Sequence, residues 1–154
     1  MSIAKIILSV RGIILVAIQF IRPARNINGQ ITPADISRVV SVPDSVQVIL
    51  HNACYNCHSN NTNYPWYSNI QPVAWFLVKH ITEGKNELNF SEFGAYSPRR
   101  QLSKLEGIVD NVTDNTMPLK SYRMMHKDAR LGQKEKTRLY NWAQHARDSL
   151  SIKN

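Results

Sequence analysis

The sequence predicts an all-α fold, in which one small helical domain follows a hydrophobic N-terminal helix. Apolar residues recur every three or four positions in several separate segments, which is the period of an amphipathic helix. No segment alternates apolar and polar residues over the length of a strand. With 154 residues and 43% hydrophobic side chains, the chain suits a single folded domain and not a disordered one.

The N-terminal segment predicts an uncleaved export signal that anchors the protein. Residues 6–21 read IILSVRGIILVAIQFI, and Lys5 and Arg11 precede their most apolar part, as in a signal sequence. No small-residue cleavage site follows in residues 22–26. Sixteen helical residues span only ~24 Å against a hydrocarbon core of ~30 Å, so an interfacial or buried helix is the alternative. We therefore predict an anchor and junction in residues 1–25 and the folded domain in residues 26–154.

Four helices are expected in the domain before its last one. A short helix begins at Thr32 or Pro33 and ends before Pro43. Asp44 can cap a helix over residues 45–53, whose apolar stripe is Val46, Ile49, Leu50 and Ala53. A helix after Pro72 places Val73, Phe76, Leu77 and His80 on one face. A helix after Pro98 has the stripe Leu102, Leu105, Val109 and Val112.

The C-terminal segment shows the clearest helical period. Gly132 is expected as its N-cap, with Glu135 at the capping-box position three residues later. The apolar stripe of this helix is Leu139, Trp142, Ala143, Ala146 and Leu150.

The motif Cys54-Tyr55-Asn56-Cys57-His58 holds the only two cysteines of the chain. C-x-x-C-H is the attachment signature of c-type haem: the thiols bond to the porphyrin, and the histidine ligates the iron. The alternatives are a redox dithiol, a disulfide, or half of a zinc site. A thioredoxin-like dithiol would follow an apolar strand, which is missing here, and zinc would need two further ligands. The candidates for those ligands, His51, His80, His126 and His145, form no finger-type pair.

Met117 is the expected sixth ligand of the iron. It lies downstream of the haem motif and before the last helix, where small cytochromes c place a thioether, and Pro118 prevents a helix from continuing through it. His80 is the alternative, and His126, Met124 and Met125 are weaker candidates.

The aromatic residues after the motif are expected to line the haem. Their apolar rings can cover its edge, and their polar groups can donate hydrogen bonds to its propionates. The carbonyl of Pro65 or Pro72 is expected to accept a hydrogen bond from the His58 ring. The predicted cofactor contacts are Tyr64, Trp66, Tyr67 and Trp75.

The charge of the chain indicates acidic partners. Lysine and arginine number 19 against 11 acids, a formal net charge of +8. The basic residues form no dense run, so we expect acidic redox proteins as partners and no nucleic acid.

Residues 54–93, CYNCHSNNTNYPWYSNIQPVAWFLVKHITEGKNELNFSEF, resemble the haem-binding domain family of membrane-anchored monohaem cytochromes c. The pieces that carry the resemblance are CxxCHS (residues 54–59), YPWY (64–67), an apolar helix with His80, and NFSEF (89–93). The junction at residues 18–26, Met117-Pro118, Tyr122 and the helix around Trp142 are also similar. The resemblance implies covalent haem at Cys54 and Cys57, with His58 as the proximal ligand.

Together these features predict a monohaem c-type cytochrome with a small cytochrome c-like fold around one haem c. The expected function is one-electron transfer at the periplasmic face of the cytoplasmic membrane, to which the N-terminus anchors the protein. The alternative is a haem-based sensor or ligand-binding module. No enzyme activity is expected, because the sequence offers no clear distal acid–base pair and no second haem motif.

Overall fold

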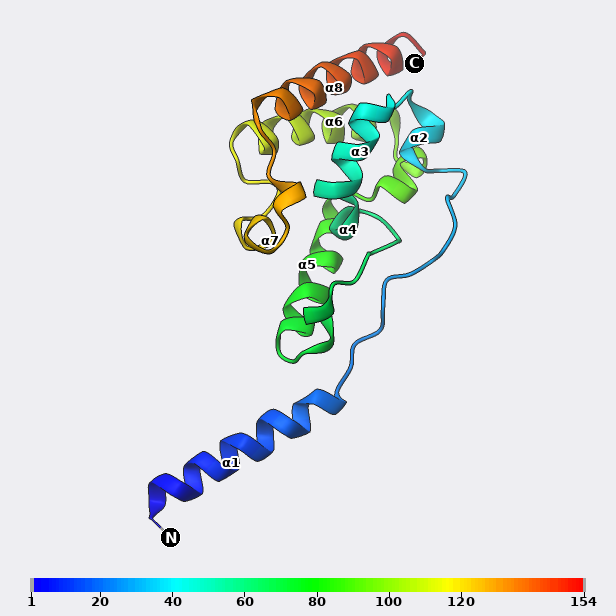
Figure 1. The fold of residues 1–154 in the computed structure, drawn as a ribbon. Coiled ribbons are helices and arrows are strands. Elements are labelled where there is room, and N and C mark those ends of the chain that lie inside the picture. The colour runs from blue at the N-terminus through cyan, green and yellow to red at the C-terminus, as the bar shows by residue number, and fades with distance from the viewer. Residues whose placement is uncertain (1, 154) are drawn as a thin grey trace.

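The computed structural model describes residues 2–153, and its secondary structure is helical (Figure 1). Within these residues no strand forms, and one isolated bridge pairs Ile27 with Asn61. The predicted all-α class is confirmed. The α-helices are α1 (Ile3–Ala17), α2 (Ile36–Val39), α3 (Asp44–Ala53), α4 (Tyr55–His58), α5 (Val73–Glu87), α6 (Pro98–Thr113), α7 (Lys120–Met125) and α8 (Gln133–Lys153). The 3₁₀ turns are η1 (Ile18–Phe20), η2 (Trp66–Asn69), η3 (Phe90–Ala95) and η4 (Lys127–Ala129).

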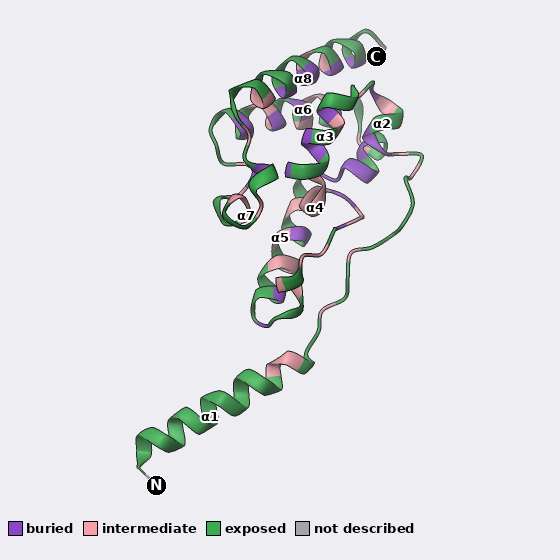
Figure 2. Ribbon diagram, in the orientation of Figure 1, coloured by how far each residue is buried: buried purple, intermediate pink, exposed green. Residues whose placement is uncertain are grey.

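The N-terminal helix projects from the rest of the molecule, and none of its residues is buried (Figure 2). Together α1 and η1 form a continuous apolar helix over Ile3–Phe20, 18 residues with a mean hydropathy of 2.0. It starts before Lys5, so it is longer than the apolar run of the sequence indicates. Eighteen residues span ~27 Å, close to the thickness of a hydrocarbon core.

Polar contacts join the end of this helix to the start of α5. The Gln19 side chain donates to the Gln71 carbonyl at 3.2 Å and accepts from the Gln71 backbone N–H at 2.9 Å. The Ile21 carbonyl accepts from the Gln71 side chain at 3.0 Å and from the Trp75 indole at 3.2 Å. The helix therefore leaves the domain at the N-terminal end of α5.

The first two helices of the domain differ from the prediction at their N-terminal ends: α2 begins later than predicted and α3 begins earlier. Helix α2 covers only Ile36–Val39, because the Asp35 side chain caps it by accepting from the Ser37 backbone N–H. Helix α3 already includes Asp44, and Pro43 takes the N-cap position.

The core lies between α3, α6, α8 and η3 (Figure 2). The predicted stripes of α3 and α8 are buried throughout, and the Trp142 indole donates to the Ser41 carbonyl at 3.0 Å. Helix α8 begins directly after Gly132, whose carbonyl accepts the first helical bond from Lys136. Helix α6 is turned slightly from the prediction: it buries Gln101, Leu105, Ile108 and Val112, and leaves Leu102 and Val109 half-buried.

Two segments differ more clearly from the prediction. Helix α5 buries Ala74 and Ile81, whereas its predicted apolar face borders a cavity. The segment after Met117 contains a helix that the sequence does not predict, α7 over Lys120–Met125. Six residues are too few to show a helical period, which explains why the sequence does not reveal this helix.

Candidate haem site

The C-x-x-C-H motif forms a short helix of its own at the end of α3. Cys54 ends α3, and its carbonyl accepts from the backbone N–H groups of Cys57 at 3.1 Å and His58 at 3.0 Å. The two cysteines are half-buried and are not joined by a disulfide. This turn holds both thiols and the His58 imidazole in one rigid segment.

The His58 ring is fixed by a backbone carbonyl. Its Nδ1 lies 3.0 Å from the Leu88 oxygen, just beyond the end of α5. A carbonyl can only accept, so Nδ1 carries the ring proton and Nε2 keeps its lone pair. Burial lowers the pKa of His58, which favours this neutral form. The prediction that the carbonyl of Pro65 or Pro72 accepts this hydrogen bond is wrong. Any residue can supply a backbone carbonyl, so the sequence does not identify Leu88 as the acceptor.

Both thiols are protonated at neutral pH. Burial raises the pKa of Cys54 to about 12, and the neighbouring Cys57 adds to the rise. Burial alone raises the pKa of Cys57 to about 11. The thiols therefore lack the electropositive surroundings of a catalytic dithiol.

Three neighbouring cavities surround the motif. The inner cavity, of about 470 Å³, lies against the core and includes Cys54, His58, Phe90 and Met117 in its wall. The middle cavity, of about 160 Å³, is bordered by Cys57, His58, Met117 and His80. The outer cavity, of about 420 Å³, has an almost wholly apolar wall that includes Cys57, Trp66, Tyr67, Leu77 and Tyr122. Adjacent cavities share wall residues, so they form one space along the motif, and its wall is most apolar in the outer cavity.

The residues predicted as a second iron ligand border different cavities. Met117 borders both cavities that His58 borders, the inner and the middle. His80 borders the middle and the outer cavity, and its Nδ1 is 3.8 Å from Glu83. His126 instead shares a hydrogen bond of 2.7 Å with the Tyr67 hydroxyl.

The end of α6 positions Met117. The Asn111 carbonyl accepts from the backbone N–H groups of Thr116 at 3.0 Å and Met117 at 3.1 Å. Asn115 adopts a left-handed conformation with φ of 59°, which turns the chain back toward the motif. These contacts hold the loop at the mouth of the middle cavity.

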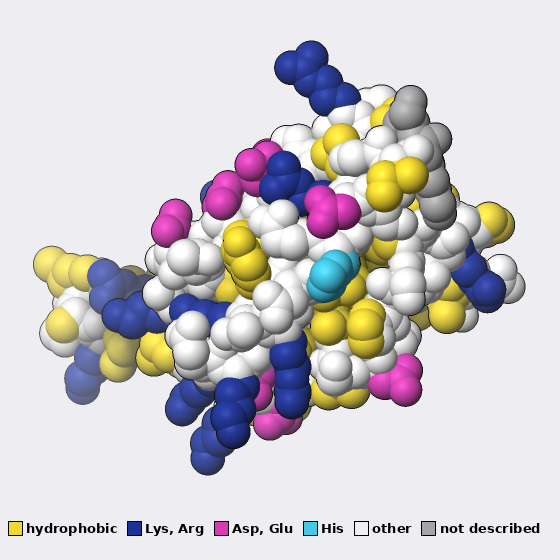
Figure 3. Space-filling model, turned by 90° about the horizontal axis from the view of Figure 1, so that it is seen from above, with side chains coloured by type: hydrophobic (Ala, Val, Ile, Leu, Met, Phe, Trp, Pro, Cys, Tyr) yellow, Lys and Arg dark blue, Asp and Glu magenta, His cyan; other side chains and the backbone are white. Residues whose placement is uncertain are grey.

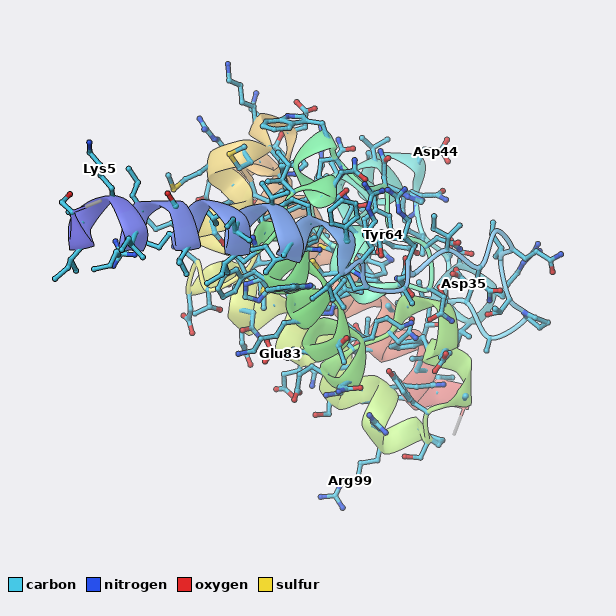
Figure 4. All side chains as sticks on the ribbon, turned by 90° about the horizontal axis from the view of Figure 1, so that it is seen from below. Lys5, Asp35, Asp44, Tyr64, Glu83 and Arg99 are labelled. Carbon is cyan, nitrogen blue, oxygen red and sulfur yellow. The ribbon has the colours of Figure 1, made fainter. Side chains whose placement is uncertain are left out.

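The predicted aromatic contacts divide into two groups. Trp66 and Tyr67 border the outer cavity. Tyr64 and Trp75 lie at the junction with α1: the Tyr64 hydroxyl accepts from the Asn26 backbone N–H at 2.7 Å, and Trp75 donates to Ile21. In Figure 4, Tyr64 lies beside the chain that follows α1. Tyr122 and Leu119 border the outer and middle cavities and were not foreseen as wall residues.

The NFSEF segment supports the motif from the opposite side. The Asn89 side chain caps η3 and donates to the Asn60 side chain at 2.9 Å. Asn60 in turn donates its backbone N–H to the Ser91 hydroxyl and its side chain to Glu92. Phe90 and Phe93 are fully buried beneath these contacts. The asparagines after the haem motif therefore form a network with NFSEF.

Gly84 allows α5 to pack closely on the motif. A Cβ at this position would lie 2.8 Å from the Cys57 carbonyl oxygen, a backbone atom that cannot rotate away. We expect Gly84→Ala to lower the free energy of unfolding by about 1–3 kcal/mol, because α4 and α5 must move apart. Urea unfolding of the intact protein measures this.

The matched control for Gly84→Ala is Gly107→Ala in α6, where an added Cβ meets nothing within 4 Å. Removing a helical glycine there should raise the stability by about 0.5–1 kcal/mol. A loss of equal size in both variants would contradict the close packing of α5 on α4.

The positions of the His, Cys, Asp and Glu side chains do not support a zinc site. Among residues 2–153, no three His, Cys, Asp or Glu side chains lie together so that they could hold a metal ion. A structural zinc needs four ligands, of which the motif supplies at most three.

The cavities, the fixed imidazole and the neighbouring thiols fit a haem. Together with the fold, they define a small all-α haem protein. The chain belongs to the haem-binding domain family, whose model matches residues 13–145. No curated protein and no solved structure matches the chain. Haem binding follows from family membership and from the site together.

Proposed function

We propose that the protein is a monohaem c-type cytochrome that carries one electron at a time. Cys54 and Cys57 attach one haem c covalently, His58 is the proximal ligand, and Met117 is the distal ligand. One observation carries the proposal: Met117 borders the same two cavities as His58, whose Nδ1 is hydrogen-bonded to the Leu88 carbonyl.

The haem would supply an iron that takes up and releases a single electron. The chain's own residues tune and protect that couple: the Leu88 carbonyl orients His58, and the apolar walls exclude water. A methionine opposite a histidine raises the reduction potential relative to two histidines. If His58 and Met117 both held the iron, no ligand position would stay open for a substrate, as expected of a carrier.

The apolar N-terminal helix supports an anchored, exported protein. Covalent haem attachment occurs outside the cytoplasmic membrane, so we place the domain in the periplasm with α1 in the cytoplasmic membrane. Lys and Arg side chains lie on several parts of the molecular surface, with Asp and Glu between them (Figure 3). The net charge of +8 favours acidic redox proteins as partners, and the lack of one dense basic patch argues against nucleic acid.

Replacing Met117 with alanine tests the distal ligand. The oxidised wild-type protein should show the weak red absorption band of a methionine–iron bond, and Met117→Ala should abolish it and lower the reduction potential. His80→Ala is the control and should keep the band. A wild-type protein without this band, or a band that persists in Met117→Ala, would overturn the assignment.

The alternative, a haem-based sensor or ligand-binding module, makes the opposite prediction for carbon monoxide. A carrier with two protein ligands resists carbon monoxide when reduced, whereas a sensor with an open site binds it at once. Rapid binding to the reduced wild-type protein at neutral pH would favour the sensor.

A further inference from the structure

An exposed group of apolar side chains surrounds the mouth of the outer cavity. They come from η2, the start of α5 and the end of α7, and all border that one cavity, so they form a continuous surface. The exposed fractions are 71% for Trp66, 62% for Phe76, 57% for Met125, 44% for Ile70 and 41% for Val73. We call these five residues the apolar rim. Contiguous exposed apolar surface of this kind usually marks an interaction site.

The apolar rim lies where the N-terminal helix meets the domain. Gln71, which exchanges two hydrogen bonds with Gln19, stands between the rim residues Ile70 and Val73. The Trp75 indole, which binds the Ile21 carbonyl, is next to Phe76. Figure 1 shows α1 running away from this end of α5. Any bilayer that holds α1 therefore comes close to the rim.

The polar groups around the rim suit a lipid headgroup layer. Arg22 and Arg25 follow the apolar helix directly, and Arg25 reaches η2 through a hydrogen bond of 2.7 Å to the Asn69 side chain. No aspartate or glutamate occurs in residues 1–34 or 45–82, which include the helix, the junction and four of the five rim residues. Arginines at the membrane surface are attracted to anionic lipids. Tryptophan, present here as Trp66 and Trp75, is enriched at the boundary between membrane and water.

We propose that the apolar rim is inserted into the headgroup layer of the same bilayer that holds α1, with the mouth of the outer cavity facing the lipid. The partner is an anionic phospholipid surface. This inference rests on the membrane anchoring proposed above. It adds that the domain is held in one orientation on the membrane and is not merely tethered to it.

Photo-crosslinking tests this orientation. The full-length, haem-loaded protein is placed in vesicles of phosphatidylcholine and phosphatidylglycerol, with benzoylphenylalanine at Phe76. Tyr140 is the control position: it is exposed, lies on α8 and does not border the outer cavity. After illumination, mass spectrometry should find lipid adducts at position 76 and none at position 140. Benzoylphenylalanine at Trp66 gives a second rim position if the first variant loses its haem spectrum.

Each outcome separates the two proposals. Equal labelling at positions 76 and 140, or adducts at the rim to haem or to a second copy of the chain, would overturn the lipid contact and leave anchoring intact. Flotation of the vesicles checks the anchor independently. A wild-type protein that does not float with them would overturn the anchoring, and the orientation with it.

Discussion

Changing both Cys54 and Cys57 to serine is expected to leave a chain that loses its haem completely on denaturation. A thioether survives denaturation, whereas axial ligation by His58 alone does not. The wild-type protein should keep a haem stain on a denaturing gel and have an intact mass one haem above that of the chain. The double variant should have the mass of the chain alone. This is the largest change expected from any substitution, because it removes every covalent link to the cofactor.

The single variants serve as internal controls. Cys54→Ser keeps Cys57 beside the middle and outer cavities, and Cys57→Ser keeps Cys54 beside the inner cavity, so some covalently bound haem should remain in both. A wild-type protein without the added mass would refute covalent attachment and return the motif to the dithiol alternative. Haem that stays on the denatured double variant would show that another residue holds it.

Leu50→Ala is expected to cost the most stability among changes away from the haem. Leu50 is fully buried in α3 and belongs to the core cluster with Phe93 and Leu139. Truncating a buried leucine lowers the free energy of unfolding by about 2–5 kcal/mol, through lost burial and the cavity left behind. Urea unfolding followed by far-ultraviolet circular dichroism would measure the loss.

Val48→Ala is the matched control, since Val48 lies on the same helix and is 59% exposed. Its effect should stay within about 0.5 kcal/mol. Because alanine has the highest helix propensity, neither change should lose stability through propensity, and similar losses in both variants would contradict the assignment of the loss to core packing.

The features that the sequence predicts most reliably are the buried faces of long helices, which follow a regular period, and the family, which follows from specific motifs. The stripes of α3 and α8 repeat over several turns, so the buried residues could be named in advance. The C-x-x-C-H motif and NFSEF indicate the haem-binding domain family without any structure. Each of these signals is local in the chain.

The apolar face of α5 is an example of what local sequence patterns do not predict. Val73, Phe76, Leu77 and His80 do share a face, as the period predicts, and all four border the outer cavity. Periodicity identifies an apolar face but not what covers it, so protein core and open cavity look alike in sequence. Tyr64 and Trp75 remain predicted haem contacts, and the structure adds hydrogen bonds that join both residues to the junction with α1. Their partners, Asn26 and Ile21, lie more than thirty residues away and could not be read from the pattern.

The high pKa values of the two thiols bear on the order of events during maturation. A thiol reacts chiefly as its thiolate, and in the folded chain both thiols stay protonated far above neutral pH. In a chain not yet packed, they would have the ordinary cysteine pKa of about 8.5 and a larger reactive fraction. The haem attachment proposed above is therefore favoured before α5 closes over α4 at Gly84. The packing of α5 on Cys57 therefore opposes the reaction that the two thiols are proposed to undergo.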